Sequence, residues 1–291
     1  MEKGTVISKT LGKARAECEF ESFVSSVEIS VEHIVKGQKT TYFQGLRRLQ
    51  QIRFDVEDNL YISNQGPSVF RLDKSGRFAE VIRISSSPRS VAGIDCLAVD
   101  AHRNVYVNDV SKHAAFKFEW DGKGYVNPIE IAKSIDGTKK SIALAPSGEI
   151  FIAVMGPPNQ GWIVRRGSDG NENSFPINGM PIYLAAGPDG NLYVPIGATS
   201  NILIYRPDGT LAGEIPYQIK DSVSDVLVSK DGGIYLAFFQ AGKILRIGFE
   251  NQLRREEFLP HAFGKPGGIA LDSRGRLYVS DFAGNSIDIV Y

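Results

Sequence analysis

The sequence predicts an all-β protein, a six-bladed β-propeller with four antiparallel strands in each blade. The main observation is an aromatic residue that recurs in the same apolar strand pattern, after a Gly/Asp-rich turn, at intervals of 45, 45, 42, 42 and 43 residues. The six aromatics are Tyr61, Tyr106, Phe151, Tyr193, Tyr235 and Tyr278. A unit this short cannot bury its own apolar faces, so the copies must stack against one another. We number the blades 1 to 6 by these aromatics.

Four short strands can be assigned around each aromatic. In blade 1 they cover residues 50–56, 59–64, 67–72 and 77–84, where apolar and polar residues alternate. Clusters of Gly, Asp, Asn and Pro separate the strands and supply the turns. No helical period of useful length competes with this pattern.

The last repeat ends at residues 286–291, which supply only a third strand. A propeller must close, because closure removes the sheet edges that would otherwise pair with other chains. The alternating segment 25–35 has no repeat of its own, so we expect it to complete the last blade. Residues 1–24 would then form an N-terminal arm, and residues 25–291 a single propeller domain.

Composition and charge exclude several classes of function. The chain has 33 basic and 33 acidic side chains, and this balance argues against nucleic acid as the main partner. It has no apolar run long enough to span a membrane, and its first residues lack the apolar core of a secretory signal. Cys18 and Cys96 are expected to be thiols rather than a disulfide, which together with the missing signal favours a cytoplasmic location.

Two stretches resemble known repeat families. Residues 268–290, GIALDSRGRLYVSDFAGNSIDIV, resemble the NHL repeat, and residues 181–205, PIYLAAGPDGNLYVPIGATSNILIY, look like a virginiamycin B lyase-type repeat. Both families belong with the wider six-bladed group that includes SMP-30/gluconolactonase-like enzymes. The resemblance covers roughly residues 45–291 and is specific for architecture, since the group contains lyases, lactonases, condensing enzymes and protein-binding modules.

The loops that vary from blade to blade are the place to look for a site. In a propeller, the loops between the second and third strands and between successive blades open on one face, around the axis; we call this end the mouth. Three residues after each aromatic, the second strand reaches that end and reads Asn64, Asp109, Val154, Ile196, Phe238 and Asp281. One arc is polar and the other apolar, which suits a small, partly hydrophobic organic ligand. An alternative is that the apolar members are simply buried strand residues.

The predicted substrate-binding residues are Asn64, Val154, Met155, Tyr183, Ile196, Phe238 and Phe239. The predicted catalytic residues are two histidines and two carboxylates at the mouth. His113 lies four residues after Asp109, and His261 lies in the loop that leads into the blade of Asp281. Imidazole is the natural acid or base near neutral pH, and a nearby carboxylate orients it. Exposed loop histidines are the alternative reading.

Asp95, eleven residues before its aromatic, matches a metal-ligand position of the SMP-30-like family, and Asp225 lies at a similar place. The resemblance therefore implies a divalent cation, Ca²⁺ or Mg²⁺, bound by carboxylate oxygens. The rest of that family's ligand set is not matched, because the equivalent positions hold Gln50, Lys140, Ile182 and Gly267.

Two functions follow as hypotheses. The first is an enzyme, a lyase, hydrolase or cyclase, that acts on a small, partly hydrophobic molecule at the mouth. The second is a non-catalytic NHL-type module that binds a protein or peptide on the same face, which the absence of a complete catalytic motif favours. A structural or lectin-like propeller is a third, minor reading.

Overall fold

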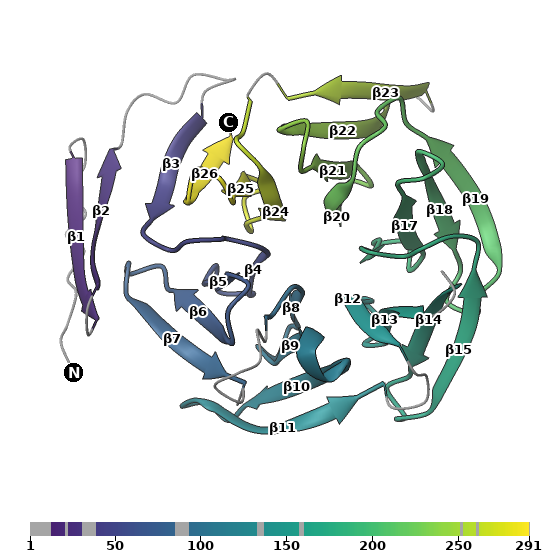
Figure 1. Cartoon of the computed structure of the whole chain (residues 1–291), viewed down its shortest axis with the longest axis horizontal. Helices are drawn as coiled ribbons and strands as arrows, with labels where there is room; N and C mark the ends of the chain where they lie inside the picture. Colours follow the sequence, from purple (N-terminus) through teal and green to yellow (C-terminus); the bar gives the residue numbers. More distant parts are fainter. Residues whose placement is uncertain are drawn as a thin grey trace.

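The computed structural model describes residues 13–20, 23–30, 39–84, 93–132, 137–156, 160–250, 253–259 and 262–290. Six four-stranded antiparallel sheets surround a common axis, and the first strand of each sequence repeat lies innermost (Figure 1). The helical structure within the described residues is a single turn of 3-10 helix, η1 (Val110–Lys112). The predicted six-bladed β-propeller is confirmed.

Blades 1 to 5 run from the axis outward in chain order, and the outermost strand of blade 6 comes from the N-terminal part of the chain. Blades 1 to 3 contain β4 (Ile52–Phe54), β5 (Leu60–Ser63), β6 (Ser68–Leu72) and β7 (Phe78–Arg83); β8 (Leu97–Val99), β9 (Val105–Asp109), β10 (Ala114–Trp120) and β11 (Tyr125–Ile131); and β12 (Thr138–Leu144), β13 (Ile150–Gly156), β14 (Gln160–Arg166) and β15 (Glu172–Ile177). Blades 4 to 6 contain β16 (Ala185–Ala186), β17 (Leu192–Ile196), β18 (Asn201–Tyr205) and β19 (Leu211–Pro216); β20 (Val223–Val228), β21 (Ile234–Phe238), β22 (Lys243–Glu250) and β23 (Leu253–Phe258); and β24 (Pro266–Leu271), β25 (Leu277–Asp281) and β26 (Ser286–Val290), joined by β3 (Lys39–Gln44).

An N-terminal strand closes the last blade, as predicted, but it is β3 rather than residues 25–35. β3 pairs antiparallel with β26, and its Phe43 is buried in the core between blades 6 and 1. Both Lys39 and Thr41 bind the buried carboxylate of Asp288 on β26, at 3.0 Å each. In β3, Phe43 therefore faces the core, whereas the polar Lys39 and Thr41 bind Asp288.

Residues 25–30 of the predicted closing segment belong to a different sheet. They lie in β2 (Phe23–Ser30), which pairs with β1 (Lys13–Phe20) as a two-stranded antiparallel hairpin outside the ring, beside β3 (Figure 1). Residues 31–35 lie outside the described residues. The predicted boundary at residue 24 thus falls inside β2, because the alternation that suggested a closing strand is used to pair with β1.

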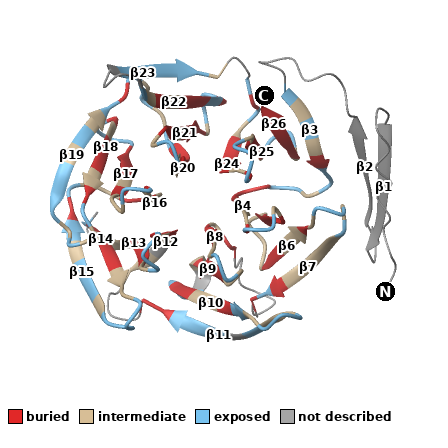
Figure 2. Cartoon of the chain, turned by 180° about the vertical axis from the view of Figure 1, so that it is seen from behind, coloured by how far each residue is buried: buried red, intermediate tan, exposed pale blue. Residues whose placement is uncertain are grey.

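Burial follows the distance from the axis. Strands in the second position of each blade are almost completely buried, whereas the outermost strands β11, β15, β19 and β23 are largely exposed (Figure 2). The apolar clusters lie between neighbouring blades, so each blade buries its faces on the next. This is the stacking that the repeat length requires.

The face opposite the mouth carries a repeated hydrogen-bond motif. Asp55 opens the turn between β4 and β5 and accepts from the backbone N–H groups of Glu57 and Asn59, at 2.9 Å each, and from the hydroxyl of Tyr61 at 3.3 Å. Equivalent Tyr–Asp bonds join Tyr106 to Asp100 in blade 2 and Tyr278 to Asp272 in blade 6, and in blade 4 Tyr193 binds Asp189, which lies two residues later in the turn. Most of the recurring aromatics thus brace the turn that precedes them.

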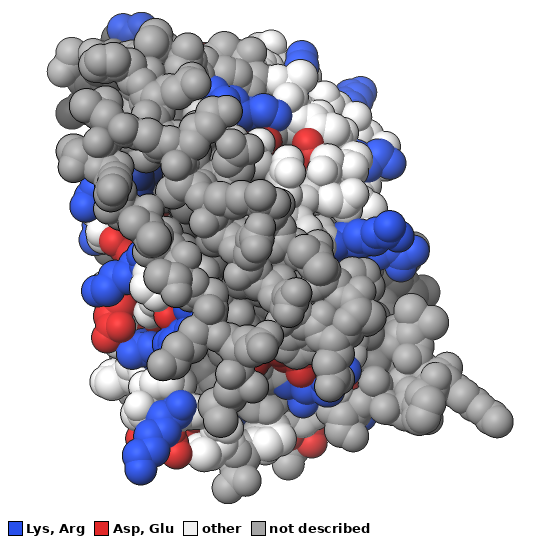
Figure 3. All heavy atoms as spheres, turned by 90° about the vertical axis from the view of Figure 1, so that its left-hand side faces the viewer, with Lys and Arg blue, Asp and Glu red and all other residues white. Residues whose placement is uncertain are grey.

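Within the described residues, no helix has the length and apolar character needed to cross a membrane. Acidic and basic side chains lie next to each other on the described part of the side shown in Figure 3.

Candidate functional site

One repeat position forms a ring of side chains around the axis. It lies ten residues before each aromatic, on or just before the innermost strand, and is occupied by Gln51, Cys96, Ser141, Tyr183, Asp225 and Gly268. In four blades this side chain accepts a hydrogen bond from the backbone N–H of the innermost strand of the next blade. We call these contacts the axial bonds.

The axial bonds use four different acceptors. Gln51 Oε1 accepts from Leu97 N at 2.9 Å, and Cys96 Sγ accepts from Ile142 N at 3.0 Å. Ser141 Oγ accepts from Leu184 N at 3.3 Å, and Asp225 Oδ2 accepts from Ile269 N at 2.9 Å. Burial raises the pKa of the Cys96 thiol to about 11, so it remains a neutral thiol. Side chains of four different types therefore have the same structural role, because each accepts a hydrogen bond from a buried backbone amide.

Blades 6 and 4 depart from this pattern. In blade 6 a side chain at Gly268 would collide with backbone atoms of blade 1, since its Cβ would lie 2.6 Å from Gln50 O. Ser280 connects these two blades instead, because its hydroxyl donates to Gln50 O at 2.6 Å. In blade 4 the residue is Tyr183, and the amide that it would have served, Val226 N, donates to Asp225 Oδ1 at 3.0 Å.

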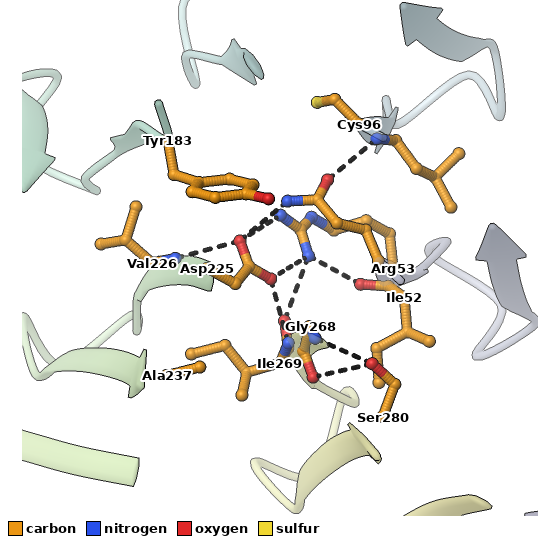
Figure 4. A network of polar contacts seen from close by, with 12 residues as sticks. Ile52, Arg53, Cys96, Tyr183, Asp225, Val226, Ala237, Gly268, Ile269 and Ser280 are labelled. Atoms are coloured by element: carbon orange, nitrogen blue, oxygen red, sulfur yellow. Dashed lines mark hydrogen bonds and ion pairs between the residues drawn. The ribbon is translucent and has the colours of Figure 1, made fainter. Parts of the chain in front are cut away.

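Tyr183 extends toward the axis, where its ring lies near Asp225 and Arg53 (Figure 4). Its hydroxyl accepts a hydrogen bond from Gln50 Nε2, at 3.5 Å, across the ring from blade 1. Burial, and then the charges of Asp225 and Asp95, raise its pKa above the ordinary tyrosine value. Tyr183 therefore remains a protonated phenol that can donate a hydrogen bond.

Asp225 is held in a buried ion pair with Arg53, which crosses the axis from blade 1 to blade 5 (Figure 4). The guanidinium nitrogens Nη1 and Nη2 of Arg53 donate to its two oxygens at 2.8 and 2.9 Å, and Gln51 Nε2 donates at 3.0 Å. Burial works to lower the pKa of Arg53, but the Asp225 charge and its hydrogen bonds raise it above the ordinary value. With the amides of Val226 and Ile269, the carboxylate has five donors.

This arrangement assigns Asp225 to an ion pair and an axial bond rather than to a metal. Among the residues that the structure describes, no group of three or more His, Cys, Asp or Glu side chains could hold a metal ion. The oxygens of Asp225 already face five donors, and the charge near the half-buried Asp95 is that of Lys140. The surroundings of Asp225 and Asp95 therefore do not fit a Ca²⁺ or Mg²⁺ site.

Asp95 lies at the mouth, half-buried, in blade 2. Burial raises the pKa of its carboxyl group, and the positive charge of Lys140 in blade 3 opposes that rise. Its backbone N–H donates to the buried Asn108 side chain at 3.0 Å, which fixes the start of β8. Next to it in the ring, Gln50 accepts from Gln65 Nε2 at 3.4 Å. One end of the axis thus has a carboxyl group, an ammonium group and two hydrogen-bonding groups from blades 1 to 4. They belong to Asp95, Lys140, Gln50 and Tyr183.

Three of the four predicted catalytic residues are described, and each has a structural partner of its own. Asp109 is buried beside Lys112 of η1, whose Nζ lies 3.4 Å from its carboxylate. Asp281 accepts from the backbone N–H groups of Gly264, Lys265, Ala283 and Gly284, and it therefore orders two loops. Although its burial opposes ionisation, these bonds lower its pKa. His113 is exposed, with Nδ1 2.9 Å from Thr138 Oγ1, and His261 lies outside the described residues.

Three of the predicted substrate-binding residues are core residues. Val154, Ile196 and Phe238 are at most 2% exposed and pack in the clusters between blades. In these blades the side chain three residues after the aromatic points into the packing between sheets, so the burial alternative holds there. Asn64 is partly exposed and caps its own loop by accepting from Gly66 N at 3.3 Å.

The next residue along each strand is the one that reaches the mouth. Four residues after the aromatic, the side chains of Gln65, Val110, Met155, Phe239 and Phe282 are partly exposed, and Gly197 is exposed. Phe239 and Phe282 meet edge to face, with ring centroids 5.5 Å apart, and Lys265 Nζ lies 5.3 Å from the centre of the Phe239 ring. Blades 5 and 6 therefore present an aromatic pair at this position, but the predicted polar arc on blades 6, 1 and 2 is not found there, because blades 2 and 6 carry Val110 and Phe282.

Sequence reasoning overlooked Gln50, Lys140 and Phe282 as members of this site. Gln50, Asp95 and Lys140 share one repeat position, eleven residues before the aromatic, where polar or charged side chains occupy blades 1, 2, 3 and 5. That pattern was visible in the sequence. Phe282 follows Asp281 as Phe239 follows Phe238, so counting one residue further would have found the pair.

The fold and the mouth define a six-bladed β-propeller with polar groups near its axis and an aromatic pair on one side. No known protein-family model matches the chain. A virginiamycin B lyase of Nocardia farcinica (strain IFM 10152) is 24% identical over 161 residues, which are 53% of this chain and 56% of that protein. The chain thus matches little more than half the length of this relative.

Solved structures agree on the architecture. A catalytically inactive virginiamycin B lyase from Staphylococcus aureus, solved with quinupristin, has a TM-score of 0.64 at 13% identity, covering 98% of this chain and 94% of that chain. A gluconolactonase from Xanthomonas campestris has a TM-score of 0.67 at 15% identity, covering 86% and 88%. At these identities the likeness shows the fold. The predicted resemblance to the propeller group of virginiamycin B lyases and gluconolactonases is confirmed at that level.

Proposed function

We propose that the protein is an enzyme that acts on a small, partly hydrophobic molecule at the mouth, and that its reaction is of the lyase type. The observation that carries this proposal is Tyr183. At its repeat position the axial bonds use Gln, Cys, Ser and Asp, whereas Tyr183 makes no axial bond and presents a phenol near the axis. A departure from a structural rule at the mouth supports a functional role.

Asp95 is the general base of the proposed reaction. Burial raises the pKa of its carboxyl group, and a base is more effective when its pKa lies closer to the working pH. In a lyase reaction, Asp95 would take a proton from a carbon next to a carbonyl group. The bond between the neighbouring carbon and its leaving group then breaks, and the electron pair from the C–H bond forms the new double bond.

Lys140 and Tyr183 serve the negative charge that this step creates. The ammonium group of Lys140 stabilises charge that develops on the carbonyl oxygen. The phenol of Tyr183 donates a hydrogen bond or a proton to the leaving group, since its pKa keeps it protonated. Gln50 orients the Tyr183 hydroxyl.

The aromatic arc holds the hydrophobic part of the substrate. Phe239 and Phe282 present partly exposed rings on the side of blades 5 and 6, and Met155 presents a flexible apolar side chain on blade 3. Fixing the apolar part there while the reacting carbon lies near Asp95 would supply orientation, which is a large part of enzymatic rate enhancement.

Turnover assays test the proposal directly. Quinupristin tests the proposed lyase reaction, because a virginiamycin B lyase solved with it shares the fold, and glucono-1,5-lactone tests the alternative of a hydrolase. We expect turnover of quinupristin and its loss, by about 100-fold or more, in Asp95→Asn. Glu80→Gln, a change on the exposed outer strand β7, is the control and should keep most of the activity. A folded protein that turns over neither compound, and is not stabilised by either in a thermal shift assay, would favour the non-catalytic binding module.

A further inference from the structure

Tyr217 has a buried hydroxyl group without a hydrogen-bond partner among the described residues. The whole residue is only 4% exposed. Burial, and then the charge of Asp221, raise its pKa to about 12, so the hydroxyl is a proton donor at neutral pH. A buried donor without a partner destabilises the folded state, so its presence calls for an explanation.

The position of Tyr217 connects it to the mouth. It follows β19 in the loop that leads from blade 4 into β20, and loops between blades open on the mouth face. Its ring packs against Phe238 with centroids 5.6 Å apart, and the partly buried Tyr183 packs against the same cluster. Tyr217 therefore packs between blades 4 and 5, in the same apolar cluster that Tyr183 contacts.

The same boundary between blades lacks an axial bond. Tyr183 donates nothing to and accepts nothing from Val226 N, which instead bonds to the carboxylate of its own neighbour, Asp225. The boundary between blades 4 and 5 is thus fastened differently from the boundaries on either side, which have the Ser141 and Asp225 axial bonds. Across this boundary Arg254 of β23 donates to Pro216 O on the outermost strands, so the polar link lies at the rim of the ring rather than near the axis.

We infer that the boundary between blades 4 and 5 opens to extend the binding site, and that Tyr217 selects substrates with a hydrogen-bond acceptor on their hydrophobic part. This inference rests on the proposed function, because it adds a specificity-determining residue to the same site. The bound acceptor, a ketone, ester or amide oxygen, receives the hydrogen bond that the free protein leaves unmade. A ligand without the acceptor leaves the donor unpaired, as it is in the free protein, and gains no hydrogen bond, so it binds less tightly.

The first test compares two buried tyrosines in the free protein. Tyr217→Phe removes the unpaired hydroxyl, so the midpoint of thermal unfolding should stay the same or rise. Tyr205→Phe is the matched control, because the equally buried Tyr205 accepts from Asn178 N at 3.3 Å and its loss leaves that amide without this acceptor. A clear fall in the midpoint of Tyr217→Phe would mean that its hydroxyl is already bonded in the free protein, which would overturn the inference.

The second test uses two probes of the same shape, acetophenone and α-methylstyrene, which differ in a carbonyl oxygen against a methylene group. Their dissociation constants are measured by NMR titration for the unaltered protein, Tyr217→Phe and Phe239→Ala. We expect the unaltered protein to bind acetophenone about three- to tenfold more tightly than α-methylstyrene, and Tyr217→Phe to bind the two equally.

The outcomes separate this inference from the proposed function. If Phe239→Ala weakens both probes while Tyr217→Phe leaves their ratio unchanged, the mouth site stands and the role of Tyr217 is wrong. If the unaltered protein binds neither probe, the proposed hydrophobic site itself is contradicted, and the inference fails with it.

Discussion

The sequence repeat is visible at one end of the propeller axis and largely lost at the other. At the turn end, blades 1, 2, 4 and 6 repeat one device, a carboxylate that accepts from the following turn and from the blade's own tyrosine. At the mouth end, each blade presents a different side chain, from Gln50 and Asp95 to Lys140 and Tyr183. Repetition therefore marks what the fold needs, and variation marks where function can arise.

The axial position lies between these extremes and teaches the most. Its residues differ in chemistry as much as those of the mouth, yet four of them perform one structural task, the acceptance of the next blade's amide. Variation alone thus does not identify a site. Tyr183 differs because it does not accept a hydrogen bond from the backbone amide of the next blade.

The largest effect is expected where the axial position also carries charge. Asp225→Ala should lower the free energy of unfolding by about 3–5 kcal/mol, because it leaves the guanidinium group of Arg53 without its counter-charge near the axis. Glu80→Ala, which breaks the exposed Glu80–Arg83 pair on β7, is the control and should cost about 0–1 kcal/mol. Urea denaturation measures both. A loss for Asp225→Ala no larger than that of the control would show that the ion pair does not fasten the ring.

The turn end offers the next effect. Asp55→Ala should cost about 2–3 kcal/mol, since the buried Asp55 carboxylate accepts from the backbone amides of Glu57 and Asn59, from the Asn59 side chain and from the Tyr61 hydroxyl. Asp169→Ala, in an exposed turn of blade 3, should change stability by about 0.5 kcal/mol or less. Blade 3 already has Ala145 and Phe151 at the equivalent positions, where neither the carboxylate nor the hydroxyl is present. Equal losses for the two variants would contradict a structural role of the repeated device.

A smaller effect tests the axial bond by itself. Cys96→Ala should cost about 1–2 kcal/mol because Ile142 N loses its acceptor and a small gap is left. Cys96→Ser should cost less, as it restores an oxygen acceptor like that of Ser141 in the next blade. If the serine variant were the less stable of the two, the thiol would be acting as a hydrophobic group rather than as an acceptor.

The smallest effect concerns pH. A carboxyl group whose pKa is raised on folding makes an unfavourable contribution to stability once the pH exceeds that raised value. Asp95→Asn should therefore stabilise the protein slightly at neutral pH, and the gain should disappear as the pH falls toward the ordinary aspartate range. If Asp95 is the base, the acidic limb of the rate profile should move to higher pH in Lys140→Met, because Lys140 lowers the pKa of Asp95. A limb that stays in place would exclude Asp95 as the titrating group.

The fold could be predicted from the sequence because the repeat is local. Spacing of the aromatics, turn residues and alternation all lie within one blade, and stacking follows from the size of the unit. The closing strand was misplaced because residues 25–35 and 39–44 both alternate, and pairing with Asp288 in β26 is a contact across the whole chain.

The site was predicted only in part, for a related reason. The lopsided ring was expected three residues after each aromatic, but the strand direction there turns Val154, Ile196 and Phe238 into the packing between blades. Tyr183 and Asp95 were named, although Asp95 was expected to bind a metal. The ion pair of Arg53 with Asp225 joins residues 172 positions apart, and no local pattern indicates it.

One measurement tests most directly whether Tyr183, unlike the residues of the axial bonds, serves function rather than stability. Tyr183→Phe removes only the hydroxyl, and its stability and its turnover of quinupristin are determined on the same preparation. We predict a free energy of unfolding within about 0.5 kcal/mol of the unaltered protein, since the Gln50 contact is long, and a loss of turnover of about 100-fold or more. A variant that loses stability to the extent expected for Cys96→Ala while keeping its turnover would contradict the assignment of Tyr183 to function.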